Sequence, residues 1–102
     1  MRTAVVQYRV LPEAAAINEA LIRKILEQLE REKLAGLRYQ AFKLEDGVSF
    51  VHVVSSNTQR PEDSPLPKLE AFRNFVAELR SRCEEQPVNM QAQPIGAYDS
   101  LG

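Results

Sequence analysis

The sequence of 102 residues is poor in the residue types that build many functional sites. It has one cysteine, one histidine and no tryptophan. A single cysteine excludes an internal disulfide framework, and one cysteine with one histidine cannot supply a Cys-rich metal centre. Its four glycines are isolated, so the chain has no glycine-rich phosphate-binding loop. We therefore expect no metal site and no cofactor.

Charge of one sign and long apolar runs are also missing. Thirteen Lys and Arg residues against fourteen Asp and Glu give a net charge of −1, which excludes the basic surface typical of nucleic-acid-binding proteins. No run approaches the roughly 20 apolar residues of a membrane span, and the start of the chain lacks the pattern of a signal peptide. Apolar residues still make up 44%, enough for a folded core. We expect one domain over residues 1–102, a cytoplasmic location, and no nucleic-acid or membrane partner.

Two periodicities organise the first third of the chain. Alternating apolar and polar residues predict a strand over Thr3–Leu11. Apolar residues spaced by three and four then predict a long helix from Pro12 to a stop at Gly36, with Asn18 on its polar side. The apolar stripe of this helix consists of Ile17, Leu21, Ile22, Ile25, Leu26 and Leu29.

A hairpin is predicted next, from strands at Leu37–Leu44 and Val48–Val54. The pair Asp46-Gly47 between them is preferred in two-residue hairpin turns, because both turn positions need a positive φ. Such a turn predicts a register in which Ala41 faces His52.

The last third predicts a helix and a strand. Apolar residues spaced by three and four indicate a helix over Pro67–Arg82, and Cys83 on its stripe is interpreted as an inert core thiol rather than a nucleophile. Pro87 breaks the chain, and Val88–Gln93 is interpreted as a weak final strand. Pro94 after it suggests a position at the sheet edge.

The order strand, helix, strand, strand, helix, strand predicts an α+β, ferredoxin-like fold, in which two helices cover one face of a four-stranded antiparallel sheet. Both faces of the hairpin are apolar, so one face needs another cover, and a second copy is the simplest one. We expect a homodimer through that face. The helices are expected on the face of Phe42, Leu44, Val51 and Val53, which would turn Tyr39 and His52 toward the partner.

The order of elements and the runs Gly36–Leu44 and Phe50–Val54 resemble the dimeric α+β barrel superfamily, near the small proteins of the antibiotic biosynthesis monooxygenase type. The resemblance covers nearly the whole chain. It implies a ligand between sheet and helices or inside the barrel, and an oxygenase that needs no cofactor. Haem-degrading relatives carry their histidine in the helix, whereas His52 lies in a strand, which argues against haem.

Four side chains are candidates for a site. His52 is a candidate catalytic base, because an imidazole titrates near working pH, although a buried histidine that is hydrogen-bonded to a tyrosine or a carbonyl is the simpler interpretation. Tyr39, Tyr8 and Phe50 are candidate ligand-binding residues, and no metal ligand is expected. We expect a small homodimer that binds a small apolar molecule or none. The alternative is a cofactor-independent monooxygenase that acts on phenol- or quinol-type molecules.

Overall fold

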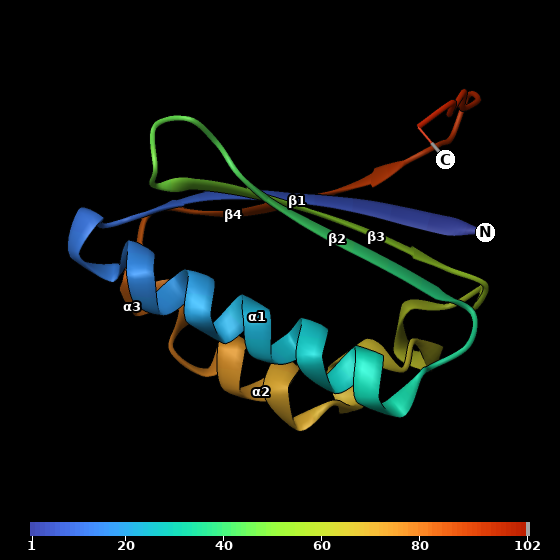
Figure 1. The fold of residues 1–102 in the computed structure, drawn as a ribbon, viewed down its shortest axis with the longest axis horizontal. Helices are drawn as coiled ribbons and strands as arrows, with labels where there is room; N and C mark the ends of the chain where they lie inside the picture. Colours follow the sequence, from blue (N-terminus) through green and yellow to red (C-terminus); the bar gives the residue numbers. More distant parts are fainter. Residues whose placement is uncertain (102) are drawn as a thin grey trace.

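The computed structural model describes residues 1–101, except for the side chain of Pro61. The strands and helices follow the predicted order (Figure 1). The strands are β1 (Arg2–Val10), β2 (Leu37–Lys43), β3 (Ser49–Ser56) and β4 (Cys83–Ala92), and the α-helices are α1 (Ala15–Glu32), α2 (Glu70–Ala77) and α3 (Leu79–Arg82). Short 3₁₀ turns are η1 (Pro12–Ala14), η2 (Pro61–Asp63) and η3 (Leu66–Lys68).

All strand pairs are antiparallel, and the sheet has the order β2-β3-β1-β4. The helices lie on one face of this sheet, and the chain after β4 extends on the opposite side (Figure 1). This arrangement confirms the ferredoxin-like α+β fold. No helix within residues 1–101 combines the length and the apolar character that crossing a bilayer requires.

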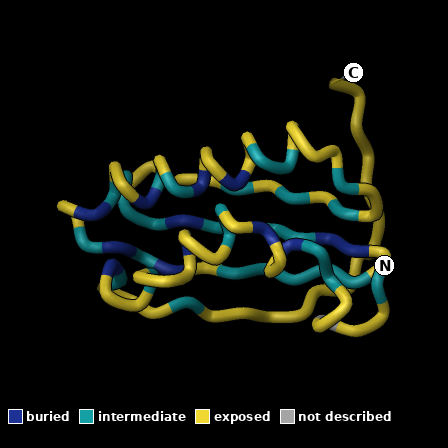
Figure 2. The backbone as a smooth tube through the Cα atoms, turned by 90° about the horizontal axis from the view of Figure 1, so that it is seen from below, coloured by how far each residue is buried: buried dark blue, intermediate teal, exposed yellow. Residues whose placement is uncertain are grey.

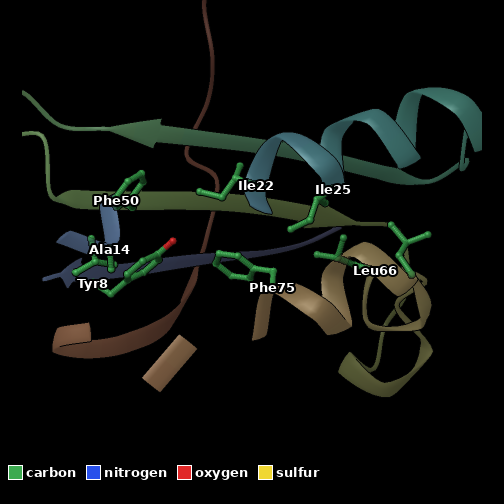
Figure 3. Packing of buried hydrophobic residues seen from close by; sticks show 9 residues of the cluster. Tyr8, Ala14, Ile22, Ile25, Phe50, Leu66 and Phe75 are labelled. Carbon is green, nitrogen blue, oxygen red and sulfur yellow. The ribbon is translucent and has the colours of Figure 1, made fainter. Parts of the chain in front are cut away.

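The core lies between the sheet and the helices, where apolar side chains of both layers meet. Buried positions follow the strands and the inner sides of the helices (Figure 2). Phe75 of α2 packs beside Tyr8 of β1, with ring centroids 6.4 Å apart (Figure 3). The buried apolar residues are Tyr8, Val10, Ala14, Ile22, Ile25, Phe50, Leu66, Leu69 and Phe75.

The expected assignment of the two sheet faces was wrong. The helices cover the face of Tyr39, Phe50 and His52, whereas Phe42 is 48% exposed on the other face. The reason lies in β1, since Tyr8 of the covered face packs against Phe50, with nearly parallel rings 5.7 Å apart. The opposite face carries polar groups from β1 and β2 that would lose water under a helix. They are Gln7, Arg9, Arg38 and Gln40.

The hairpin has the predicted register but a different turn. Ala41 faces His52 as expected. The turn is closed by the N–H of Gly47, which donates to the carbonyl oxygen of Leu44 at 3.0 Å, so Glu45 and Asp46 are its central residues. Within this loop only Gly47 has a positive φ, of 79°. The loop is therefore two residues longer than a two-residue turn, while its ends stay in the same pairing.

The first helix ends earlier than predicted. Lys33, with φ 50°, adopts the left-handed conformation after Glu32, and its N–H donates to the carbonyl oxygen of Leu29 at 2.8 Å. Gly36 also has a positive φ, of 75°, but it lies in the connection to β2. The left-handed cap is thus taken by a lysine three positions before the glycine that the sequence favoured.

The second helix and the last strand also differ from their predicted bounds. Helical geometry is interrupted at Glu78 (φ −120°, ψ 19°), and the strand begins at Cys83 rather than Val88. Between the pairs Gln7–Val88 and Arg9–Glu85, β4 has one residue more than β1, which is a β-bulge. Pro87 lies in this bulge of an edge strand, where a missing N–H is tolerated.

Candidate functional site

A cavity of about 580 Å³ lies between the sheet and the segment from η3 to α3. This volume is in the range of small-molecule sites. Its lining is mostly apolar, with Arg2 and Ser56 toward one end of the sheet and Tyr8 and His52 toward the other. The lining residues are Arg2, Ala4, Val6, Tyr8, Tyr39, His52, Val54, Ser56, Ser64, Leu66, Pro67, Phe72, Phe75, Val76, Leu79, Asn89 and Gln91.

Three of the four predicted site residues meet at this cavity. Nε2 of His52 lies 2.7 Å from the hydroxyl oxygen of Tyr8, and its Nδ1 lies 2.6 Å from the hydroxyl oxygen of Tyr39. The register explains the arrangement, because His52 pairs with Val6 and Ala41, and each tyrosine is two residues along from that partner. Aromatic side chains reach such diagonal neighbours on one sheet face.

Two residues that the sequence analysis did not select extend this network. The Nδ2 group of Asn18, on α1, donates to the Tyr8 hydroxyl at 2.9 Å. Nε of Arg82, at the end of α3, donates to Oδ1 of Asn18 at 3.0 Å, and its Nη2 donates to the carbonyl oxygen of Phe75 at 2.7 Å. We call the chain Arg82–Asn18–Tyr8–His52–Tyr39 the hydrogen-bond relay.

Burial keeps the central groups of the relay neutral near pH 7. It lowers the pKa of His52 from 6.5 to about 4, so the imidazole carries no charge. Burial also raises the pKa of the Tyr8 and Tyr39 hydroxyls, so both stay protonated. Burial lowers the pKa of Arg82, yet a guanidinium remains charged over the working range. The relay is therefore a neutral chain attached to one buried cation.

The fourth predicted residue, Phe50, lies away from the cavity lining. It is buried against Tyr8, where it supports the tyrosine ring. Cys83 is half-buried at the start of β4, and burial raises the pKa of its thiol, which disfavours the reactive thiolate. Within residues 1–101, no three His, Cys, Asp or Glu side chains lie close enough together to bind a metal ion.

The geometry also limits what His52 can do. Both ring nitrogens lie within hydrogen-bonding distance of a tyrosine hydroxyl, so neither is left to contact a molecule in the cavity. A proton could move between His52 and a ligand through the hydroxyl of Tyr39 or of Tyr8, and the Tyr8 hydroxyl already contacts Asn18 as well. Of these three residues, Tyr39 is therefore the one whose hydroxyl can still bond a molecule in the cavity, with His52 behind it.

Comparison with solved structures shows the same fold in several proteins. A crystal structure described as an antibiotic biosynthesis monooxygenase aligns with TM-score 0.75 at 21% identity, over 94% of this chain and 100% of that one. Rv0793 from Mycobacterium tuberculosis aligns with TM-score 0.75 at 15% identity, over 96% and 98% of the two chains. A candidate antibiotic biosynthesis monooxygenase from Nitrosomonas europaea aligns with TM-score 0.77 at 16% identity, over 94% and 100%.

These neighbours bear out the resemblance drawn from the sequence at the level of fold. Their identities lie too far below those of close relatives to carry an activity across. No family model and no curated protein matches the chain.

Proposed function

We propose that the chain is a small-molecule-binding protein whose cavity holds a mostly apolar, ring-sized molecule with one polar group near Tyr39. The observation that carries this proposal is the cavity itself, which is lined mainly by apolar side chains and has two hydrogen-bonded tyrosines and a histidine in its wall. Ligand pockets commonly combine an apolar lining with a few fixed polar groups.

We further propose that the protein works as a cytoplasmic homodimer. Apolar side chains from all four strands gather on the sheet face that the helices leave open. We call this the open face; it consists of Val5, Phe42, Leu44, Val51, Val53, Val88 and Met90. Met90 is 65% exposed there, Val88 58% and Phe42 48%, and apolar side chains exposed together often mark an interface. A second copy on a two-fold axis would cover both patches at once.

Binding of 2-naphthol, followed by its fluorescence, tests the cavity. Val76 lines the cavity and is partly exposed, whereas Ala77, the next residue of α2, does not line it. Val76→Trp should fill the entrance and weaken binding at least tenfold, and Ala77→Trp should leave it unchanged. Equal binding by the two variants would place the naphthol elsewhere and contradict the proposal.

A second candidate function is a cofactor-independent monooxygenase that acts on phenol- or quinol-type molecules. The contact of His52 with Tyr39 at the cavity favours it, because with an unprotonated Nδ1 this pair could accept and pass on a substrate proton. The carbonyl tautomer of such a substrate has an acidic CH₂ group. Loss of a proton gives a carbanion that reduces O₂; one oxygen atom then remains as a carbonyl on that carbon, and the other leaves as water. All electrons come from the substrate.

Oxygen uptake with 1,4-naphthohydroquinone tests this second candidate. The protein should increase uptake above the spontaneous rate, and His52→Gln and Tyr39→Phe should abolish the increase while circular dichroism shows an intact fold. Ala77→Trp serves as the active control. An increase that survives both site variants would remove the monooxygenase from consideration at this cavity.

A further inference from the structure

We propose that Asn18 and Arg82 fix His52 as the tautomer with its proton on Nδ1, so that Tyr39 points a hydroxyl proton into the cavity. The cavity then selects molecules whose polar group accepts a hydrogen bond, such as a carbonyl or an aromatic ring nitrogen. This inference rests on the proposed binding function and adds to it the class of ligand and two positioning residues.

The direction of the relay is set at Arg82, which can only donate hydrogen bonds. Its Nε contacts Asn18 at 3.0 Å, so the side-chain oxygen of Asn18 must face it. The amide nitrogen of Asn18 then faces Tyr8 and donates to its hydroxyl at 2.9 Å. Asn18 is fully buried, and its amide has no freedom to turn without breaking both contacts.

The Tyr8 hydroxyl passes this direction on to His52. Its oxygen already accepts from Asn18, and its own proton needs an acceptor, because the group is buried. Nε2 of His52, at 2.7 Å, is the only acceptor in reach within residues 1–101. Nε2 is therefore unprotonated, and a neutral imidazole must then carry its proton on Nδ1.

The Nδ1 proton of His52 completes the relay at the cavity. It is donated to the hydroxyl oxygen of Tyr39 at 2.6 Å, so Tyr39 uses its oxygen as an acceptor and keeps its own proton. Within residues 1–101 this proton meets no protein acceptor, and Tyr39 lines the cavity. A ligand acceptor would supply the missing partner.

The charge of Arg82 favours the same class of ligand. Its side chain is buried and lies 5.3 Å from the Phe75 ring centroid, and no carboxylate within residues 1–101 is at salt-bridge distance from it. Each hydrogen bond of the relay points away from this cation. An acceptor at Tyr39, with its partial negative charge, therefore lies at the favourable end of an aligned set of dipoles.

The tautomer can be measured directly, because His52 is the only histidine of the chain. Two-bond proton–nitrogen correlation spectra of the full-length protein at pH 7.5 should show a protonated Nδ1 and a bare Nε2. A protonated Nε2 would overturn the inference, whether or not any ligand binds.

Asn18→Asp should reverse the relay with little change in shape. The carboxylate would pair with Arg82 and accept the Tyr8 proton, so the Tyr8 oxygen would accept from Nε2–H of His52. Nδ1 would then accept from Tyr39, whose oxygen would offer a lone pair to the cavity. The spectra of this variant should show the proton on Nε2, and an unchanged Nδ1–H tautomer would contradict the role of Asn18.

The affinities of three bicyclic molecules of similar size test whether the cavity prefers a hydrogen-bond acceptor. Quinoline only accepts a hydrogen bond, indole only donates one, and naphthalene does neither. The wild type should bind quinoline roughly three- to tenfold more tightly than naphthalene, as one hydrogen bond warrants, and indole no more tightly than naphthalene. Asn18→Asp should exchange the ranks of quinoline and indole.

The outcomes separate this inference from the proposed function. If all three probes bind equally in the wild type, the selection is wrong while binding stands. If none binds although Nδ1 is protonated, the proposed binding function fails, and the positioning of His52 by Asn18 and Arg82 is retained.

Discussion

The hydroxyl oxygen of Tyr8 lies 2.7 Å from Nε2 of His52, although 44 positions separate the two residues in the sequence. The contact joins the two central strands of the sheet on the face that the helices cover. It closes a polar chain inside an apolar layer, so stability and ligand binding depend on the same few hydrogen bonds.

Acid should destabilise the protein through His52. Its pKa is about 4 in the folded state against 6.5 ordinarily, so the unfolded chain takes up a proton first as the pH falls. The stabilisation is complete above pH 6.5 and is lost toward pH 4, by roughly 3 kcal/mol at most. Urea unfolding at pH 7 and pH 4.5 should show a larger loss for the wild type than for His52→Gln. Equal losses would mean that His52 is not buried as a neutral group.

Removal of the Arg82 side chain should destabilise the fold strongly. Arg82→Met leaves the side-chain oxygen of Asn18 and the carbonyl oxygen of Phe75 without a donor inside the protein. We expect a loss of about 2–4 kcal/mol in the free energy of unfolding. Arg80→Met, on the same helix but exposed, should change it by less than about 0.5 kcal/mol. Similar losses in both variants would show that the buried contacts add nothing.

A charge on the open face should dissociate the proposed dimer. Met90 is 65% exposed on this face, and Ile17 is 57% exposed on α1. In sedimentation velocity, Met90→Glu should shift the protein from dimer to monomer, whereas Ile17→Glu should stay dimeric. Both variants should keep the wild-type circular dichroism. A wild type that remains monomeric at high concentration would rule out the dimer.

A side chain at position 47 should destabilise the hairpin turn. Its φ of 79° lies in the left-handed region, although the space around it is open, so the cost of Gly47→Ala is conformational. We expect a loss of about 1 kcal/mol in the free energy of unfolding. Gly96→Ala, also in open space but without a positive φ, should have almost no effect. If the two alanine variants unfold alike, the turn does not hold its glycine in a strained conformation.

Local patterns were sufficient to predict much of the fold. Alternation gave β1 and the hairpin strands, and a spacing of three and four gave the helices, because each periodicity follows from local backbone geometry. The pairing of Ala41 with His52 also followed, since a two-residue and a four-residue loop centred on Asp46-Gly47 leave the strands in the same pairing. The covered face did not follow from the hairpin alone, because Tyr8 and Phe75, which pack on it, come from distant parts of the chain.

The candidate site was predictable only in part. The sole histidine and the tyrosines stood out by their chemistry, and the register placed Tyr39 near His52. The burial of Asn18 could have been predicted from its spacing, because it lies four residues before Ile22 and seven before Ile25 on the buried side of α1. The role of Arg82 could not have been predicted from local spacing. Its contact with Asn18 spans 64 positions and exists only after the end of α3 packs beside α1.

The bulge at Pro87 has a consequence for the side chains beyond it. The two faces of a strand exchange when its pairing slips by one residue. A proline is tolerated in a bulge or where the N–H of an edge strand faces solvent, but an alignment that required Pro87 to donate to β1 would lose a hydrogen bond of the ladder. Pro87 thereby favours one alignment for the residues of β4 that follow it. It keeps Asn89 and Gln91 turned toward the cavity, and Val88 and Met90 turned toward the open face.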